Sequence, residues 1–220
     1  MVAVIDQALS QMVLPNISWK TFEKILDEIG ETHYRVTYDN GELEFMTLSL
    51  EHENYGRWIG RLIFLVALEL GMPLRTGGST TLKEALRNIG LEPDECFWIQ
   101  HAKALRGKKK WSAGKDPPPD LAVEIDITSS WLDRLGIYAS LKVPEVWRFD
   151  GEMLKILILM PNGEYAEKRR SLTFPSLPID EFANFVIRLD AEDEMPLVQE
   201  FIAWLRSDVV AKPRAKNGKK

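Results

Sequence analysis

The chain has 220 residues, and 45% of them are hydrophobic, which is enough for one domain with a packed core. Its formal net charge is -5, and because five basic residues lie among the last nine, the rest of the chain carries about -10 by subtraction. An acidic body of this kind is not the usual footprint of a nucleic-acid-binding protein. The single cysteine, Cys96, excludes an internal disulfide and a cysteine-rich zinc site.

The first quarter of the chain predicts a loose start, a helix, a hairpin and a second helix. Residues 1–16 are expected to be a flexible N-terminus without the features of a secretion signal. The segment SWKTFEKILDEIG predicts a helix that begins after Ser18 and stops at Gly30. HYRVTYDNGELEFM then predicts a hairpin that turns at residues 39–41, and residues 51–70 predict a long, largely apolar and therefore central helix.

The rest of the domain, predicted to run from residue 17 to 208, alternates strands and helices. Residues 73–83 and 95–105 predict two strands joined by a loop at 88–94, and an acidic strand follows the exposed basic run RGKKK at 106–110. A helix is expected at 131–142, three strands between 144 and 170, and two helices in the last quarter. This mixture predicts an α+β fold. Residues 209–220 are expected to be a disordered basic tail.

No apolar run is long enough to cross a membrane, and a single cysteine suits a reducing compartment. We therefore expect a cytoplasmic protein that has no membrane contact.

The acidic strand, within PPPDLAVEIDITSS, carries the clearest chemical signal in the sequence. Asp120, Glu124 and Asp126 alternate with apolar residues and so share one face of the strand. Their negative charges repel one another unless a positive group lies over that face. At ~3.3 Å per residue, Asp120 and Glu124 lie ~13 Å apart, too far to share one ion. A hard cation such as Mg²⁺ needs further oxygen ligands. Asp94, in EPDE before the preceding strand, is the nearest source.

Several purely structural interpretations of these residues remain open beside a metal site. Asp120 follows three prolines and suits a turn or a strand edge. Asp94 is equally suited to a turn, whereas Asp126 can be a ligand, a partner of Arg134 or a solvated carboxylate. His52 can form a local hydrogen bond near its helix start or touch a substrate.

The order of the motifs resembles a known nuclease superfamily. A PD dipeptide at the edge of one strand, a carboxylate in the middle of the next strand (VEI) and a basic residue close behind it are similar to the PD-(D/E)XK nucleases. DNGELEFM running into His52 and Glu53, the PDLAVEI strand followed by Thr128, and the passage YASLKVPEVWRFDG resemble one branch, the Uma-two family of restriction-endonuclease-like proteins. The likeness covers roughly residues 30–170.

The resemblance implies a restriction-endonuclease-like mixed sheet flanked by helices and a metal-dependent DNA endonuclease that hydrolyses phosphodiester bonds. Asp94 and Glu124 would bind Mg²⁺ or Mn²⁺, which would activate a water and neutralise developing charge. Glu53 or Glu51, on the first turn of the long helix, would complete the site. Nucleases of this size often pair to cut both strands of DNA, so a homodimer is an expected arrangement.

Two positions depart from the pattern of the family. The residue two after Glu124, where the superfamily has lysine, is Asp126. In this branch the lysine is commonly supplied four residues before a tyrosine, and Arg134 holds that place before Tyr138. Arginine keeps the charge and can bind phosphate, but it cannot give up a proton to activate water. The alternative is therefore a catalytically lapsed nuclease-fold binding or assembly module, which the acidic body also favours.

Overall fold

The computed structural model describes residues 11–30, 34–127, 130 and 132–211. The expected flexible N-terminus up to residue 10 and the expected basic tail from residue 212 lie outside the described residues. Within the described part, both boundaries differ from the prediction. Gln11–Leu14 form strand β1, because they pair with β3 at a sheet edge, and Leu205–Val210 form the helical segment η4, whose Val209 is buried in the core.

Five strands form what we call the N-terminal sheet, in the order β1-β3-β2-β6-β5, with antiparallel pairing throughout. Its strands are β1 (Gln11–Leu14), β2 (Tyr34–Asp39), β3 (Glu42–Thr47), β5 (Leu82–Glu84) and β6 (Ile89–Leu91). Helix α1 (Trp19–Ile29) covers one face, where the rings of Phe22 and Tyr38 stack 4.5 Å apart. The sequence predicted this helix with its Ser18 cap and its Gly30 stop, and it predicted the β2–β3 hairpin. It did not predict that the hairpin belongs to a separate sheet.

Six strands form the central sheet, in the order β11-β10-β9-β8-β7-β4. Its strands are β4 (Arg75–Thr76), β7 (Glu95–Trp98), β8 (Leu121–Ile125), β9 (Glu145–Phe149), β10 (Leu154–Leu159) and β11 (Tyr165–Lys168). The pair β8–β9 is parallel and the other pairs are antiparallel, so the sheet is mixed. The fold is thus the predicted α+β arrangement of a mixed sheet flanked by helices.

The segment from 73 to 105 is the part of the fold that the sequence placed least well. The expected strand at 95–105 is a strand only at its start, because β7 ends at Trp98 and residues 102–105 form a helical turn. The expected strand at 73–83 divides into β4 in the central sheet and β5 in the N-terminal sheet, and the expected loop at 88–94 contains β6. The chain changes sheet at Gly77, where an added Cβ would lie 2.5 Å from Cys96 Sγ. Only glycine permits so close a passage over the buried cysteine, so the strand pattern breaks there.

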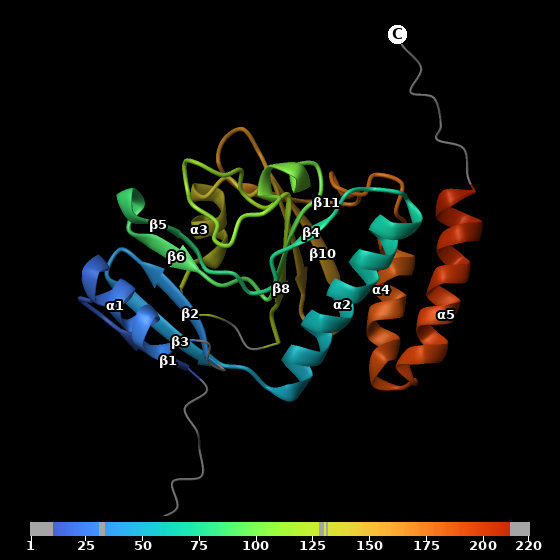
Figure 1. The fold of residues 1–220 in the computed structure, drawn as a ribbon. Helices are drawn as coiled ribbons and strands as arrows, with labels where there is room; N and C mark the ends of the chain where they lie inside the picture. Colours follow the sequence, from blue (N-terminus) through green and yellow to red (C-terminus); the bar gives the residue numbers. More distant parts are fainter. Residues whose placement is uncertain (1–10, 31–33, 128–129, 131, 212–220) are drawn as a thin grey trace, which may run out of the picture.

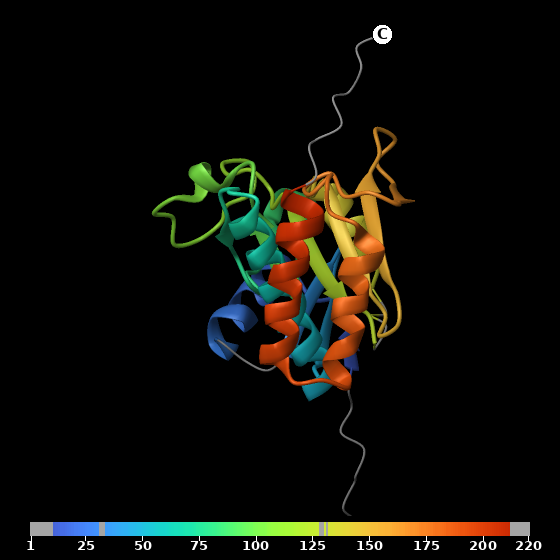
Figure 2. The same ribbon diagram turned by 90° about the vertical axis from the view of Figure 1, so that its right-hand side faces the viewer.

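Helices cover both faces of the central sheet. Figures 1 and 2 show α2 (Leu50–Glu69), α4 (Ile179–Ile187) and α5 (Glu194–Trp204) side by side on one face. They bury the largest apolar core against Val123, Ile125 and Trp147. The helix α3 (Arg134–Ser140) packs on the opposite face, together with β5 and β6. Short helical turns lie at η1 (Ala85–Arg87), η2 (Ala102–Leu105) and η3 (Arg188–Asp190).

The long helix α2 confirms the expected central helix over residues 51–70. Ser49 caps it by accepting a hydrogen bond from the backbone N–H of His52, and Trp58 Nε1 donates to the Phe185 carbonyl at 3.0 Å. In the described part of the chain, no helix has the length and apolar character needed to cross a membrane. The first turn of α2 lies beside the polar face of β2 and the start of β7, and these elements frame the candidate site.

Candidate functional site

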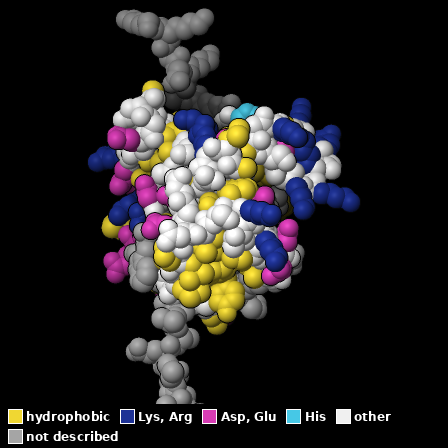
Figure 3. All heavy atoms as spheres, turned by 90° about the vertical axis from the view of Figure 1, so that its left-hand side faces the viewer, with side chains coloured by type: hydrophobic (Ala, Val, Ile, Leu, Met, Phe, Trp, Pro, Cys, Tyr) yellow, Lys and Arg dark blue, Asp and Glu magenta, His cyan; other side chains and the backbone are white. Residues whose placement is uncertain are grey.

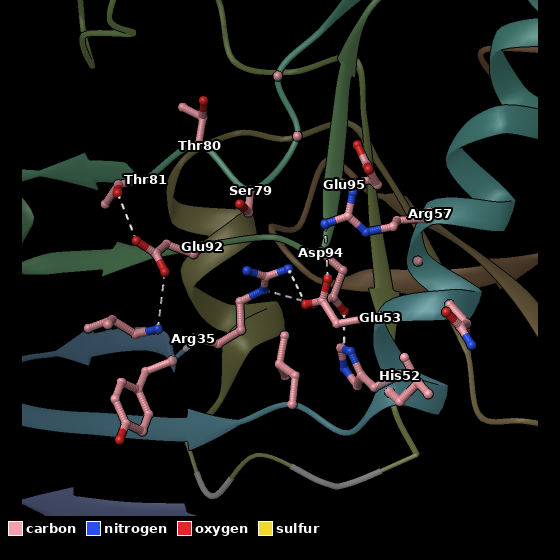
Figure 4. A pocket seen from close by; sticks show the side chains of 18 of the residues that line it. Arg35, His52, Glu53, Arg57, Ser79, Thr80, Thr81, Glu92, Asp94 and Glu95 are labelled. Atoms are coloured by element: carbon pink, nitrogen blue, oxygen red, sulfur yellow. Dashed lines mark hydrogen bonds and ion pairs between the residues drawn. The ribbon is translucent and has the colours of Figure 1, made fainter. Parts of the chain in front are cut away.

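A cleft of about 890 Å³ lies between the N-terminal sheet and the first turns of α2. Figure 4 shows the charged side chains that point into it from β2, from α2 and from the segment before β7. The charged residues that line the cleft are Arg35, Glu53, Arg57, Glu92, Asp94 and Glu95. Four carboxylates thus face two arginines, which leaves an excess of two negative charges when every group is ionised.

Asp94 lies at the centre of this cluster. Its Oδ1 accepts a hydrogen bond from Arg35 Nε at 3.1 Å, and its Oδ2 accepts one from the backbone N–H of Ile125 at 2.7 Å. His52 is buried, and its Nε2 lies 3.5 Å from Asp94 Oδ2. The sequence left open a turn role for Asp94, but the side chain is held at the start of β7 and joins the N-terminal sheet to β8.

Glu124 and Arg134 form a bidentate pair, and their side chains are only 13% and 11% exposed. Arg134 Nε donates to Glu124 Oε2 at 2.9 Å, and Nη2 donates to Oε1 at 2.7 Å. The Tyr138 hydroxyl also donates to Glu124. Burial raises the pKa of Glu124 and the nearby charge of Asp94 adds to this rise, although Arg134 and Tyr138 oppose it. Asp94 is thus near enough for its charge to act on Glu124.

The guanidinium of Arg134 is almost fully committed to the protein. Besides its two bonds to Glu124, it donates to Thr37 Oγ1 at 2.6 Å and to the Glu92 carbonyl at 2.8 Å. Four contacts thus engage a group that has five N–H donors. Burial opposes its charge, but the Glu124 carboxylate outweighs this effect and raises the pKa of Arg134. Arg134 does not line the cleft, and neither does Glu124.

Arg35 instead supplies the cation at the centre of the cleft. Its Nη2 lies 3.5 Å from Glu53 Oε1, so the same guanidinium bridges Glu53 and Asp94. Arg57 approaches the other oxygen of Glu53, also at 3.5 Å, and its side chain is 70% exposed. Of the two glutamates that the sequence proposed on this helix, Glu53 lines the cleft, whereas Glu51 is exposed outside it.

Glu95 is the least constrained carboxylate of the cleft. Burial raises its pKa to about 7, although Arg35 and Arg57 oppose the rise. Within the described residues no hydrogen bond or ion pair holds its side chain, which lies against α2 where Gly60 leaves room for it. An alanine Cβ at that position would lie 3.2 Å from Glu95 Cδ.

Each acidic residue in or beside β8 is contacted by a cation or a hydrogen-bond donor, and the contacting group differs from one acid to the next. Asp120 accepts from the backbone N–H groups of Ile99 and His101 at 2.7 and 3.0 Å and from the His101 ring, which confirms a structural role for it at the strand edge. Glu124 has Arg134, and Asp126 pairs with Arg148 of β9. Of the three roles left open for Asp126, ion pairing is therefore the one observed, although its partner is not Arg134.

The donors around Asp94 and Glu124 are of the kind that a hard cation takes. Mg²⁺ is commonly bound by one or two carboxylates while waters and substrate phosphate complete its ligands. No set of three or more His, Cys, Asp or Glu side chains in the described ranges is arranged as a metal site. Each of the four carboxylate oxygens already accepts a hydrogen bond from the protein, so an ion would compete with Arg35 and Arg134 for them.

Sequence reasoning missed several residues that complete the cluster. They are Arg35, Thr37, Glu92, Glu95 and the hydroxyl of Tyr138. A signal existed for the first two, because Arg35 and Thr37 alternate with Val36 and Tyr38 and therefore share the face of β2 that α1 leaves free. The pattern indicated a polar face but not which acids it would meet.

Comparison with known proteins places the chain in a family. The Uma2 family model, described as "Putative restriction endonuclease", matches residues 19–191, which is most of the chain. The protein therefore belongs to this family, as its motifs indicated. A solved structure, of a "putative nuclease" from Anabaena variabilis ATCC 29413, is similar with a TM-score of 0.47 and 13% identity, over 86% of this chain and 99% of that one. No curated protein matches the chain.

Proposed function

We propose that the protein is a metal-dependent DNA endonuclease that hydrolyses phosphodiester bonds and uses Mg²⁺ or Mn²⁺. Membership of the Uma2 family supports a nuclease-like function. The observation that carries the metal-dependent part is the excess of carboxylates over arginines in a cleft that reaches Asp94. A divalent ion would balance this charge, and Arg35 and Arg57 would remain to face the phosphate.

In this proposal the charged groups nearest to Asp94 and Glu124 have distinct roles. Asp94, which lines the cleft, and Glu124, which lies outside its lining, would hold the metal ion, which when bound would lower the pKa of a water and offset the charge that develops on the phosphate. Glu53 is the accessory acid, and Glu51 is not needed. Arg134 is a positioning residue that orients Glu124, and Arg35 supplies the cationic contact that the sequence had assigned to Arg134.

Cleavage of supercoiled plasmid DNA tests this function. The protein should nick or cut in Mn²⁺ or Mg²⁺ and should stop when a chelator is added, and Asp94→Asn and Glu124→Gln should abolish the reaction. Glu53→Gln should slow it by roughly 10- to 100-fold, the range for residues that support metal ligands. The matched control is Glu51→Gln, two residues away in the first turn of α2 and outside the cleft, which should keep wild-type activity. Cleavage that survives both chelator and Glu124→Gln would refute the assignment.

A second candidate is a lapsed nuclease that now serves as a binding or assembly module. The guanidinium of Arg134, with four of its five N–H donors engaged by the protein, favours it, because Glu124 is then used to hold the fold together. Calorimetric titration with Mn²⁺ separates the two functions: this module should neither bind the ion through Asp94 nor cleave DNA. Arg134→Lys provides a further distinction, since recovery of cleavage by this variant would identify a site that lapsed through the arginine.

A further inference from the structure

The loop between β7 and β8 carries the densest group of basic side chains in the described chain. Between residues 103 and 115, which we call the basic loop, six side chains are cationic and exposed: Lys103, Arg106, Lys108, Lys109, Lys110 and Lys115. Figure 2 shows this part of the chain, in green, projecting at the upper left of the molecule, and Figure 3, from the opposite side, shows Lys and Arg side chains gathered at the upper right.

Most of these charges have no acidic partner. Lys108 pairs with the buried Asp116, but within the described residues the other five cations of the basic loop form no ion pair. The arginines of the cleft are used differently, since Arg35 and Arg57 both contact Glu53. Because these five cations have no ion-pair partner within the described residues, their charge is available to an anionic partner, although the body as a whole is acidic.

The basic loop is also held in one shape. Asp116 accepts from the backbone N–H of Ser112 at 2.9 Å as well as from Lys108, and Trp111 Nε1 donates to the Pro117 carbonyl at 2.8 Å. Leu105 is buried in a small apolar cluster with Trp98, and Trp111 packs against that cluster. A surface whose backbone is fixed in advance loses less entropy on binding than a free tail does.

We infer that the basic loop is a docking surface for the phosphate backbone of double-stranded DNA. Phosphate contacts from Lys and Arg position a duplex without reading its sequence, and they gain affinity by releasing counterions. The loop leaves the far end of β7, whereas Asp94 precedes the near end of that strand. At ~3.3 Å per residue the four-residue strand alone spans about 13 Å, or about four base-pair steps of a duplex, and the basic loop begins beyond its far end. The loop would therefore hold DNA that flanks the cleft.

The inference rests on the proposed function for its choice of DNA, but binding can be measured without cleavage. The test variant is Arg106→Gln/Lys109→Gln/Lys110→Gln, which leaves the anchoring Lys108 intact. The matched control is Lys168→Gln/Arg169→Gln/Arg170→Gln, an equal loss of charge from another exposed run. Fluorescence anisotropy with a labelled duplex, in chelator and again in Ca²⁺, gives the affinity at several salt concentrations, and circular dichroism confirms that both variants fold.

The loop variant should bind at least roughly 10-fold more weakly, and its slope of log affinity against log salt should fall by about 2 to 3, near one unit for each lost phosphate contact. The control should keep the wild-type slope. Equal weakening of both variants, or no binding by the wild type in either buffer, would overturn the inference. The inference would also be overturned if the loop variant bound DNA as the wild type does but lost binding to vesicles of phosphatidylserine and phosphatidylcholine. That result would identify a membrane partner.

The two proposals fail in different ways. If the wild type binds DNA through the loop but never cleaves in Mn²⁺, the docking surface stands and the nuclease function falls. If the loop variant binds and cleaves as the wild type does, the nuclease function stands and the docking surface falls.

Discussion

Glu95 is the carboxylate of the cleft whose charge changes near neutral pH. Burial raises its pKa to about 7 from 4.5, with Arg35 and Arg57 opposing the shift and Asp94 and Glu53 adding to it. Because the folded-state pKa is the higher one, the stability that Glu95 contributes is fully present below about pH 4.5 and is lost as the pH rises through about 7. The loss amounts to at most about 3 kcal/mol.

Glu95→Gln removes this titration, so the variant should gain stability relative to the wild type as the pH rises from 4.5 to 8. Urea unfolding in the presence of chelator measures the difference at each pH. Glu51→Gln makes the same chemical change at an exposed position of α2 and should show no such trend. A difference between wild type and Glu95→Gln that is flat across this range would contradict the prediction.

The sequence predicted site residues whose position depends on one strand or on its immediate neighbour in the chain. It did not predict the contacts that form where the two sheets meet. Glu124 could be placed because strand alternation fixes its face, and Asp94 because it directly precedes the neighbouring strand. Arg35 could not be matched with Asp94, since that contact depends on how the N-terminal sheet docks onto the central sheet. The partners of Arg134 in β2 and before β7 depend on the same docking.

At the scale of the element, α2 carries two glycines, one turn apart, against the acids that begin β7. A Cβ added to Gly56 would lie 3.7 Å from Asp94 Cβ, an ordinary contact, whereas one added to Gly60 would lie 3.2 Å from Glu95 Cδ. Alanine is favoured over glycine inside a helix by about 1 kcal/mol. Gly56→Ala should therefore raise the free energy of unfolding by about 0.5 to 1 kcal/mol, and Gly60→Ala should gain less because Glu95 must move.

Urea unfolding of the two alanine variants checks this difference. Gly60→Ala made in a Glu95→Ala background supplies the control, since removal of the crowded side chain should restore the full gain. The explanation fails if Gly60→Ala remains inferior to Gly56→Ala after Glu95 has been shortened.

The sequence predicted the elements whose caps, apolar stripe or length are visible within the segment itself. It did not predict the short strands that exist only because a neighbouring strand pairs with them. The first helix was found from its cap, its stripe and its terminal glycine, and α2 from its length and apolar surface. Strands β1 and β6 have four and three residues and are strands only because a neighbour pairs with them. Their short sequences carry too little alternation to identify them.

At the scale of the whole molecule, Arg134 joins the two sheets. From α3 it contacts Glu124 in the central sheet and Thr37 in the N-terminal sheet, and its side chain is only 11% exposed. Arg134→Met would leave Glu124 as an unpaired buried carboxylate, so we expect a loss of about 3 to 5 kcal/mol in the free energy of unfolding. Arg206 is the matched control, because it pairs equally well with Glu69 but is 66% exposed. Arg206→Met should cost less than about 1 kcal/mol.

A double variant separates the cost of the unpaired charge from the cost of the lost link between the sheets. In Arg134→Met/Glu124→Gln no buried carboxylate is left unpaired, so most of the stability lost in Arg134→Met should return. The link to Thr37 is still missing, and the backbone amides of β2 should therefore exchange hydrogen faster than those of β8 and β9 in this variant. Full recovery of stability with uniform exchange would show that Arg134 only neutralises Glu124. A double variant as unstable as Arg134→Met would instead place the whole cost in the contact between the sheets.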